Sequence, residues 1–394
     1  MRLGPWSAKI EAHENREERS VSESTVLESR QGAPGQRDLI VDCDAHNFPM
    51  IEDLEPYLST RWREYLETFG MRSPSEFGIV RARWMASRAD SWSPSGKLPG
   101  SDPEFFLQQL VDGVGIDYAI LNSIVMSAQQ FVGGNQPAEF TAAVMAATND
   151  WVAERWLDRD DRLRASICTP FEHPPLLVRE ADRWAADGRF VQVQIPYRTQ
   201  KPLGDRKYWE MFELCTARGM PLALHPGSIG NNLITGAGWV SFYFEDHAGL
   251  PHALYSQMAS LVCEGVFDRF PDLRLVIQEG GWSWVAPFLW RFDRLFEQLH
   301  REVPHLQRKP SEYIREHFWF TTQPIEEPDA PQQFGEALAA LDMPGRLLYS
   351  SDYPHWDFDP PSALPPSLDA DLRRAILGEN ALAVYDLERT GVRR

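Results

Sequence analysis

Cysteine is scarce in this chain of 394 residues, and the few cysteines that occur are not paired. All 4 stand singly in apolar surroundings, and the sequence has no Cys-x-x-Cys motif: Cys43, Cys168, Cys215 and Cys263. Disulfide frameworks are built from cysteines at regular, clustered spacings. We therefore expect reduced core cysteines and no disulfide framework.

Long hydrophobic runs and an excess of positive charge are missing as well. No apolar stretch approaches the length of a membrane-spanning helix, and residues 1–20 contain no apolar signal-peptide core. The formal net charge is -18, so the chain would repel phosphate backbones and anionic lipid surfaces. We expect a cytoplasmic protein that acts on a small molecule and binds neither nucleic acid nor membranes.

The chain does contain a regular alternation of short strand-like runs and longer helix-like segments. Residues 1–37 are polar and lack this rhythm, so they are predicted to form a poorly ordered or extended arm before a single domain at 38–394. The eight strand-like runs lie at residues 38–46, 117–124, 163–169, 189–195, 220–225, 273–279, 316–322 and 346–352. Eight such units predict an α/β fold of the (β/α)8 TIM-barrel type, with long insertions after strands one and five.

An open, doubly wound sheet is the structural alternative, and it would be expected to bind a dinucleotide. No Gly-x-Gly-x-x-Gly loop follows any of the expected strands. The nearest glycine cluster is "GGWSW" at 280–284, where the indoles would block the approach of a phosphate. The barrel is therefore the favoured fold.

Ionisable side chains end four of the expected strands. Asp44 and His46 end the first strand, His225 the fifth, Glu279 the sixth and Asp352 the eighth. The carboxyl ends of barrel strands surround one axis, so these side chains are expected to converge. Imidazoles mixed with carboxylates suit one divalent ion such as Zn²⁺ or Mn²⁺, and they disfavour an all-oxygen calcium site.

Further polar and aromatic residues lie close to these strand ends in the sequence. Asp42 is expected on the strand face of Asp44, one step deeper, where it would orient a metal ligand. His355, in "DYPH", is either a partner of Asp352 or an ordinary loop residue. Candidates for contacting the substrate, with surface or core packing as the alternative for each, are Arg198, His247, His252, Trp282 and Trp356.

Five segments together resemble the amidohydrolase-related family of metal-dependent barrels. They are "VDCDAHNFP", "LALHPGS", "GVFDRFPDLRLVIQEGGWSWV", "YSSDYPHWD" and "ILGENALAVYDL", in the order and spacing of that family. The family includes aminocarboxymuconate-semialdehyde decarboxylase and decarboxylases of aromatic acids. The resemblance covers about residues 38 to 387 and does not identify the substrate. Related enzymes are often dimers, so a homodimer is one state that the resemblance suggests.

The resemblance implies a set of metal ligands for this chain. The acidic-x-His pair of strand one falls on Asp44 and His46, the strand-five ligand on His225 and the strand-eight ligand on Asp352. Sites of this type usually hold one metal ion, with an open position for water or substrate. Asp44 stands where relatives often have histidine, which moves the expected preference from Zn²⁺ toward Mn²⁺.

Glu279 departs from the family pattern. The decarboxylases commonly have a histidine before this glycine pair and use it in acid–base chemistry. Glu279 could serve as a general base or proton shuttle, as a residue that orients a ligand, or as an extra ligand. The family's substrate-binding arginine in the first long connection has three candidates, Arg81, Arg83 and Arg88.

The candidate ligands and the family resemblance leave three possible functions. The leading one is hydrolysis of an amide, ester, lactone or activated C–C bond of a small, partly planar molecule by metal-activated water, with Asp352, Glu279 and His247 as the catalytic candidates. The alternative is non-oxidative decarboxylation of an aromatic or unsaturated acid at the same site. The third is a non-catalytic barrel used for binding, and the presence of all four candidate ligands disfavours it.

Overall fold

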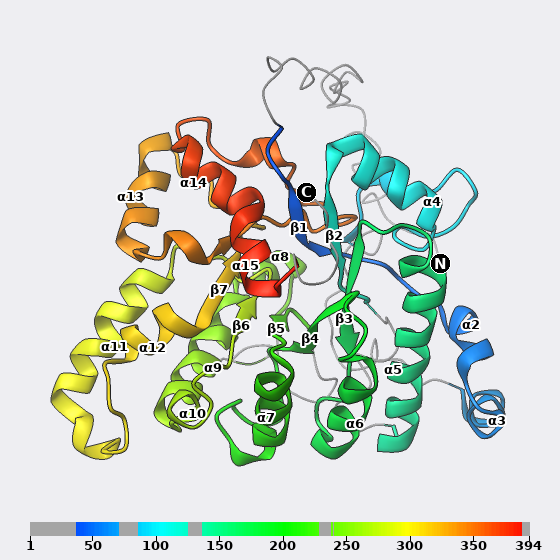
Figure 1. Cartoon of the computed structure of the whole chain (residues 1–394), viewed down its shortest axis with the longest axis horizontal. Coiled ribbons are helices and arrows are strands. Elements are labelled where there is room, and N and C mark those ends of the chain that lie inside the picture. Colours follow the sequence, from blue (N-terminus) through cyan, green and yellow to red (C-terminus); the bar gives the residue numbers. More distant parts are fainter. Residues whose placement is uncertain (1–36, 71–85, 125–135, 228–237, 239, 388–394) are drawn as a thin grey trace, which may run out of the picture. The chain divides into compact units, whose positions relative to one another are not determined.

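A computed structural model describes residues 37–70, 86–124, 136–227, 238 and 240–387 of this chain. Eight parallel strands form one sheet in the order of the sequence, and helices surround them (Figure 1). The strands are β1 (Val41–Ala45), β2 (Tyr118–Leu121), β3 (Leu163–Cys168), β4 (Phe190–Pro196), β5 (Leu222–His225), β6 (Leu275–Ile277), β7 (Phe318–Thr321) and β8 (Leu347–Leu348).

The barrel closes through the segment that follows β8, because β8 itself has only 2 residues. The amide of Cys43 donates to the carbonyl of Tyr349 at 3.0 Å, and the amide of His46 donates to the carbonyl of Tyr353 at 2.7 Å. The amide of Asp352 donates in turn to the carbonyl of Asp44 at 2.9 Å. These bonds join the end of β1, which carries Asp44 and is followed by His46, to residues 349–353, which contain Asp352.

Helices connect the strands and bury their outer faces. The α-helices are α2 (Ile51–Leu54), α3 (Thr60–Phe69), α4 (Pro103–Phe106), α5 (Ala138–Val152), α6 (Pro174–Trp184), α7 (Trp209–Arg218), α8 (Tyr243–Ala248), α9 (Pro251–Cys263), α10 (Val266–Arg269), α11 (Val285–Leu299), α12 (Pro310–His317), α13 (Pro331–Leu341), α14 (Ala370–Arg374) and α15 (Asn380–Tyr385). Shorter 3-10 and π-helical segments are η1 (Glu55–Tyr57), η4 (Ala89–Ser91), η5 (Leu107–Gly115), η6 (Ala153–Leu157), η7 (Arg206–Tyr208), η8 (His300–Glu302), η9 (Pro344–Arg346), η10 (Pro361–Ala363) and η11 (Ala375–Glu379).

Helix α15 covers the amino ends of the strands. Ala381, Val384 and Tyr385 pack with Val41 of β1 and Val191 of β4 in a core of their own, separate from the larger core under the outer helices. Because both faces of every strand are buried, the strands read as short apolar runs in the sequence. This end of the barrel is therefore closed by apolar packing, and the polar side chains gather at the other end.

The structure confirms the eight strands and the (β/α)8 barrel in place of the open sheet. Two strands end earlier than the sequence predicted, β6 at Ile277 and β8 at Leu348. Glu279 and Asp352 therefore lie in the segments that follow these strands. Of the three candidate arginines, Arg81 and Arg83 lie outside the described residues, as does nearly all of the predicted arm. The placement of insertions after strands one and five and the homodimer stay predictions.

Within the described residues, no helix is both long and apolar enough to cross a membrane.

Candidate metal centre

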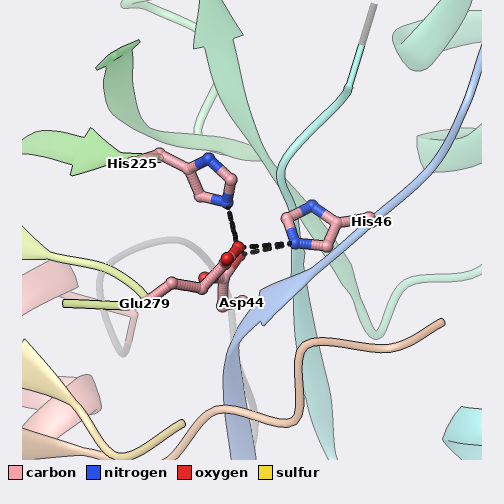
Figure 2. A group of neighbouring side chains, drawn as sticks. All are labelled: Asp44, His46, His225 and Glu279. Atoms are coloured by element: carbon pink, nitrogen blue, oxygen red, sulfur yellow. Dashed lines mark hydrogen bonds and ion pairs between the residues drawn. The ribbon is translucent and has the colours of Figure 1, made fainter. Parts of the chain in front are cut away.

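Four side chains from three parts of the barrel converge at the carboxyl ends of its strands. One donor atom from each of Asp44, His46, His225 and Glu279 lies within 4.8 Å of the others. Figure 2 shows the two carboxylates between the two imidazoles. A second group of donors, made by His46, Glu279, Asp352 and His355, shares two members with the first. Because of these shared donors, the two groups describe one centre.

The histidines and the carboxylates reach this centre in different ways. His225 is the last residue of β5, and His46 directly follows β1, so regular strand ends position the imidazoles. Glu279 and Asp352 lie in left-handed backbone, with φ of 48° and 58°. This conformation is costly for a residue with a side chain and persists where the surroundings enforce it. Here the amide of Glu279 donates to Oγ1 of Thr321 at 3.2 Å.

Both imidazoles present their Nε2 atoms to the centre. Nδ1 of His46 lies 2.8 Å from the carbonyl of Asn122, and Nδ1 of His225 lies 2.7 Å from the carbonyl of Pro226. A carbonyl oxygen only accepts, so each Nδ1 carries the hydrogen, and Nε2 of a neutral ring offers a lone pair. That lone pair then faces carboxylate oxygens, an arrangement that needs a proton or a cation between the two groups.

The distances from Nε2 show how close these groups are. Nε2 of His46 lies 2.8 Å from Oδ1 of Asp352 and 3.3 Å from Oε1 of Glu279. Nε2 of His225 lies 2.6 Å from the same Glu279 oxygen. Nevertheless Nε2 of His225 and Oδ2 of Asp44 are buried and have no hydrogen-bond partner in the described part of the chain. Buried nitrogen and oxygen atoms that have a lone pair and no hydrogen-bond partner are suited to bind a metal ion.

The charges of the carboxylates favour a divalent ion as well. Burial raises the pKa of Asp44 to about 6, although His46 and His225 act against this rise. Burial also acts to raise the pKa of Glu279, but His225 and His46 outweigh it and hold this pKa well below its usual value. Burial acts to lower the pKa of His46 and of His225, but the neighbouring carboxylates outweigh it and raise both, so that without a metal the rings favour a proton. One divalent ion could replace these protons and offset the charge of the three carboxylates. The donor set therefore fits a single ion such as Zn²⁺ or Mn²⁺.

A chain of buried polar side chains, which was not predicted from the sequence, orients Asp44. Nδ2 of Asn122, after β2, donates to Oδ1 of Asp44 at 2.6 Å. The carbonyl oxygen of the same amide accepts from Ser166 of β3, whose hydroxyl accepts from Gln192 of β4 at 2.8 Å. Partners of this kind fix the position of a metal ligand. The signal in the sequence was the presence of Ser and Gln inside otherwise apolar strands.

Asp42 is fully buried, and it contacts the backbone rather than the side chain of a candidate ligand. It accepts hydrogen bonds from the amide of Ser351 at 2.9 Å and from the hydroxyl of Ser351 at 2.5 Å, and from the amide of Asp44 at 3.2 Å. The pairing register between β1 and β2 shifts between Asp42 and Ala45, so strict side-chain alternation does not hold there. Asp42 thus lies where it can fix the backbone of Asp44, and the orienting role stays a prediction.

The metal-free protein is expected to lose stability as the pH rises from about 5 to about 7. Burial raises the pKa of Asp42 from 3.8 to about 7, so in this range the unfolded chain releases a proton that the folded chain keeps. The free energy of unfolding must then fall with rising pH, by on the order of 3 kcal/mol for this group alone. The low pKa of Glu279 changes the stability in the opposite direction, but only at pH values below the usual glutamate pKa of 4.5.

Denaturant unfolding with a chelator at a series of pH values measures this dependence. The variant Asp42→Asn should show a flatter profile, because its amide does not titrate. A free energy of unfolding that stays constant or rises between pH 5 and 7 in the unmodified chain would contradict the expectation.

Two of the remaining candidates are histidines that each contact a carboxylate after β8. Nδ1 of His355 is 2.5 Å from Oδ1 of Asp352, so the structure places this histidine beside a candidate ligand. His247, on α8, has its Nε2 2.9 Å from Oδ2 of Asp357 and its ring stacked on Tyr243. His247 is therefore paired with a carboxylate after β8 and is not one of the converging donors.

The candidates for substrate contact are dispersed. Nη2 of Arg198 is 2.8 Å from Oδ1 of Asp246, so this guanidinium holds α8. Trp282 is fully buried against Phe334, which is the position of a core residue. Trp356 is 55% exposed, and His252 is exposed near the start of α9.

Arg88, the described one of the three candidate arginines, pairs with Asp90 at 2.6 Å. Its guanidinium is therefore held by a neighbouring carboxylate through two hydrogen bonds.

Comparison with known proteins gives the family of the chain. The family model described as amidohydrolase matches residues 41–387, which is nearly the whole barrel. Among solved structures, the chain is similar to an amidohydrolase from Mycobacterium avium subsp. paratuberculosis, with 21% identity and a TM-score of 0.67 over 89% of this chain and 100% of the other.

Two similar structures are decarboxylases crystallised with manganese. The dihydroxybenzoic acid decarboxylase from Polaromonas sp. JS666, with the inhibitor 2-nitroresorcinol, shares 19% identity and a TM-score of 0.60 over 90% of this chain and 98% of that one. The 5-carboxyvanillate decarboxylase from Novosphingobium aromaticivorans, with 4-hydroxy-3-methoxy-5-nitrobenzoic acid, shares 16% identity and a TM-score of 0.67 over 89% and 96%. At this identity the likeness shows the fold, whereas the family model covers the barrel with its candidate metal centre, and the chain therefore belongs to the amidohydrolase family.

Proposed function

We propose that this chain is a metal-dependent decarboxylase of an aromatic carboxylic acid. The observation that carries the proposal is a buried set of imidazole and carboxylate donors that fits one divalent ion. It occurs in a fold shared with two aromatic-acid decarboxylases that were crystallised with manganese. These likenesses support the alternative from the sequence better than the hydrolysis that the sequence analysis favoured.

The metal would be held by Asp44, His46, His225 and Asp352, with Glu279 as a fifth group at the same place. When bound, it would supply positive charge that orients the anionic oxygens of the substrate and offsets their repulsion from the carboxylates. The role of each of these residues is part of the proposal.

The protein must deliver one proton for each carboxylate that is lost. In the proposed reaction the ring carbon that bears the carboxylate takes up a proton, the C–C bond to that group then breaks, and CO₂ leaves while the ring recovers its aromaticity. Asp352 is the group that we assign to this transfer, because its Oδ1 faces the centre 2.8 Å from Nε2 of His46. His355 contacts the same oxygen and is partly exposed, so it connects Asp352 to water.

The reaction is tested by product analysis with the manganese-loaded and zinc-loaded chain. A panel of hydroxybenzoates, amides and lactones is incubated with each form, and the products are identified by mass spectrometry. We expect loss of CO₂ from a hydroxybenzoate and, in D₂O, one deuterium on the carbon that carried the carboxylate. Addition of water to an amide or lactone with no CO₂ release would overturn the proposal.

Hydrolysis is the second candidate, and one observation favours it. Oε1 of Glu279 lies 2.6 Å from Nε2 of His225 and 3.3 Å from Nε2 of His46, so this carboxylate is placed beside the position that a metal-bound water would occupy. A carboxylate beside a metal centre is a suitable base for attack by water on an amide, ester or lactone. The same product analysis separates the two reactions.

A further inference from the structure

Gln194 is a buried amide whose side chain has no partner. It lies on β4 and is 4% exposed, and neither its Nε2 nor its Oε1 has a hydrogen-bond partner in the described ranges. Native proteins satisfy nearly all such groups, and each exception calls for an explanation such as a bound water or a ligand. An amide inside a barrel that no described protein group satisfies has both its donor and its acceptor free for a water or for a ligand group.

Strand geometry places this amide inside the barrel. Side chains alternate along a strand, so Gln194 shares a face with Gln192. Gln192 donates to Asn122 at 3.3 Å, and Asn122 donates to Asp44. That face of β4 therefore points into the barrel. Gln194 comes two residues after Gln192, so it lies nearer to the carboxyl end of the strand, where the candidate metal centre lies.

The pairing with β5 leads to the same position. Gln194 is paired with Ala223, and Pro196 with His225. The side chain of Ala223 is a single methyl group, which cannot hydrogen-bond the amide, and His225 is two residues farther along the same strand. Gln194 and His225 have similarly small exposed fractions, 4% and 3%. Both residues therefore lie in the buried interior, close to the carboxyl ends of the strands.

The chemistry of an amide defines the ligand group that it would bind. The amide carries no charge, donates from Nε2 and accepts at Oε1, so it matches a neutral hydroxyl, which also donates and accepts. We propose that Gln194 binds a hydroxyl substituent on the aromatic ring of the substrate and thereby selects among ring-hydroxylated acids. This inference rests on the proposed function and adds the residue and the substituent that determine specificity.

The test measures binding rather than turnover. Calorimetry with the metal-loaded chain compares salicylate with the isomeric dihydroxybenzoates, which add one hydroxyl at different ring positions. We expect one isomer to bind the unmodified chain at least ~10-fold more tightly than salicylate, because a site built to hydrogen-bond a hydroxyl rejects an analogue without it. In Gln194→Met this preference should disappear, while salicylate binding changes by less than about 2-fold.

Thermal unfolding without ligand provides a second measurement. Methionine keeps the length of the side chain and removes an unsatisfied amide, so Gln194→Met should melt at the same temperature as the unmodified chain or higher. The matched control is Gln257→Met, because the amide of Gln257 is satisfied by the carbonyl of Tyr197 at 2.6 Å and the amide of Leu203 at 2.7 Å. This variant should melt lower and keep the isomer preference.

Two results would overturn the proposal. Gln194→Met could keep the isomer preference, which would mean that water alone satisfies the amide, or it could weaken all the acids equally, which would mean a structural role. If the methionine variant does not fold, Gln194→Asn withdraws the amide by one methylene and should lose the preference in the same way. Selective binding without CO₂ release would support the role of Gln194 and contradict the proposed decarboxylation. CO₂ release without selective binding would support the decarboxylation and contradict the role of Gln194.

Discussion

Asp352→Asn is expected to lower the turnover number by about 10²- to 10⁴-fold, the range for loss of a positioned acid–base group. Asparagine keeps the size of the side chain and one oxygen that can face the metal, but it cannot transfer a proton. The proposal assigns the proton for the ring carbon to this residue, whose Oδ1 lies between Nε2 of His46 and Nδ1 of His355. Steady-state kinetics on the acid found by product analysis, with metal content measured in parallel, gives the result.

The matched control makes the same change in the same loop. Asp357→Asn removes a carboxylate that pairs with His247 and not with the donor cluster, so its turnover should fall by less than about 10-fold. A small loss of turnover in Asp352→Asn with the metal retained would contradict the assignment of the proton. Loss of both metal and activity would show that this carboxylate serves as a ligand that asparagine does not replace.

His225→Ala is expected to weaken metal binding by at least ~100-fold, since the loss of a group that only orients a ligand already costs about 10- to 100-fold. The hydrogen on Nδ1 is fixed by the carbonyl of Pro226, so Nε2 is the free donor of this ring. Without it, the ionised Glu279 carboxylate, 2.6 Å away, loses its nearest partner. Metal content after dialysis should fall from about one ion per chain to a small fraction of that.

A second measurement in the same experiment reports on folding. Manganese should raise the melting temperature of the unmodified chain, because an ion that binds the folded state stabilises it, and this rise should be absent in His225→Ala. His252→Ala removes an exposed histidine from α9 and should change neither quantity. Unchanged metal content in His225→Ala would exclude His225 from the ligand set.

The candidate ligands differ in how well the sequence located them. His225 ends a regular apolar strand, so the position of its imidazole followed from strand alternation alone. Glu279 and Asp352 were assigned to the same cluster, but on the assumption that β6 and β8 continue to these residues. The structure instead uses positive φ values at both positions, which no local sequence pattern indicates because such a backbone is held by its surroundings.

Contacts between side chains that are far apart in the chain could not be predicted from the sequence either, because they too depend on the tertiary structure. Asn122 directly follows β2, Ser166 lies on β3 and Gln192 on β4, and their contact depends on the register between these strands. Arg198 and Asp246 are likewise far apart in the chain, and their ion pair changes the interpretation of Arg198 from a free clamp to a residue that holds α8.

The sequence by itself determined the barrel and the identity of the candidate metal donors. Short apolar runs at intervals of one helix specify parallel strands that are buried on both faces, and ionisable residues at their carboxyl ends must then meet at the barrel axis. Only the tertiary structure decided which atoms face one another, which buried groups are left unsatisfied and which charged pairs hold the mouth of the barrel. These depend on strand register and backbone bends, which are set by packing across the whole barrel rather than by neighbouring residues.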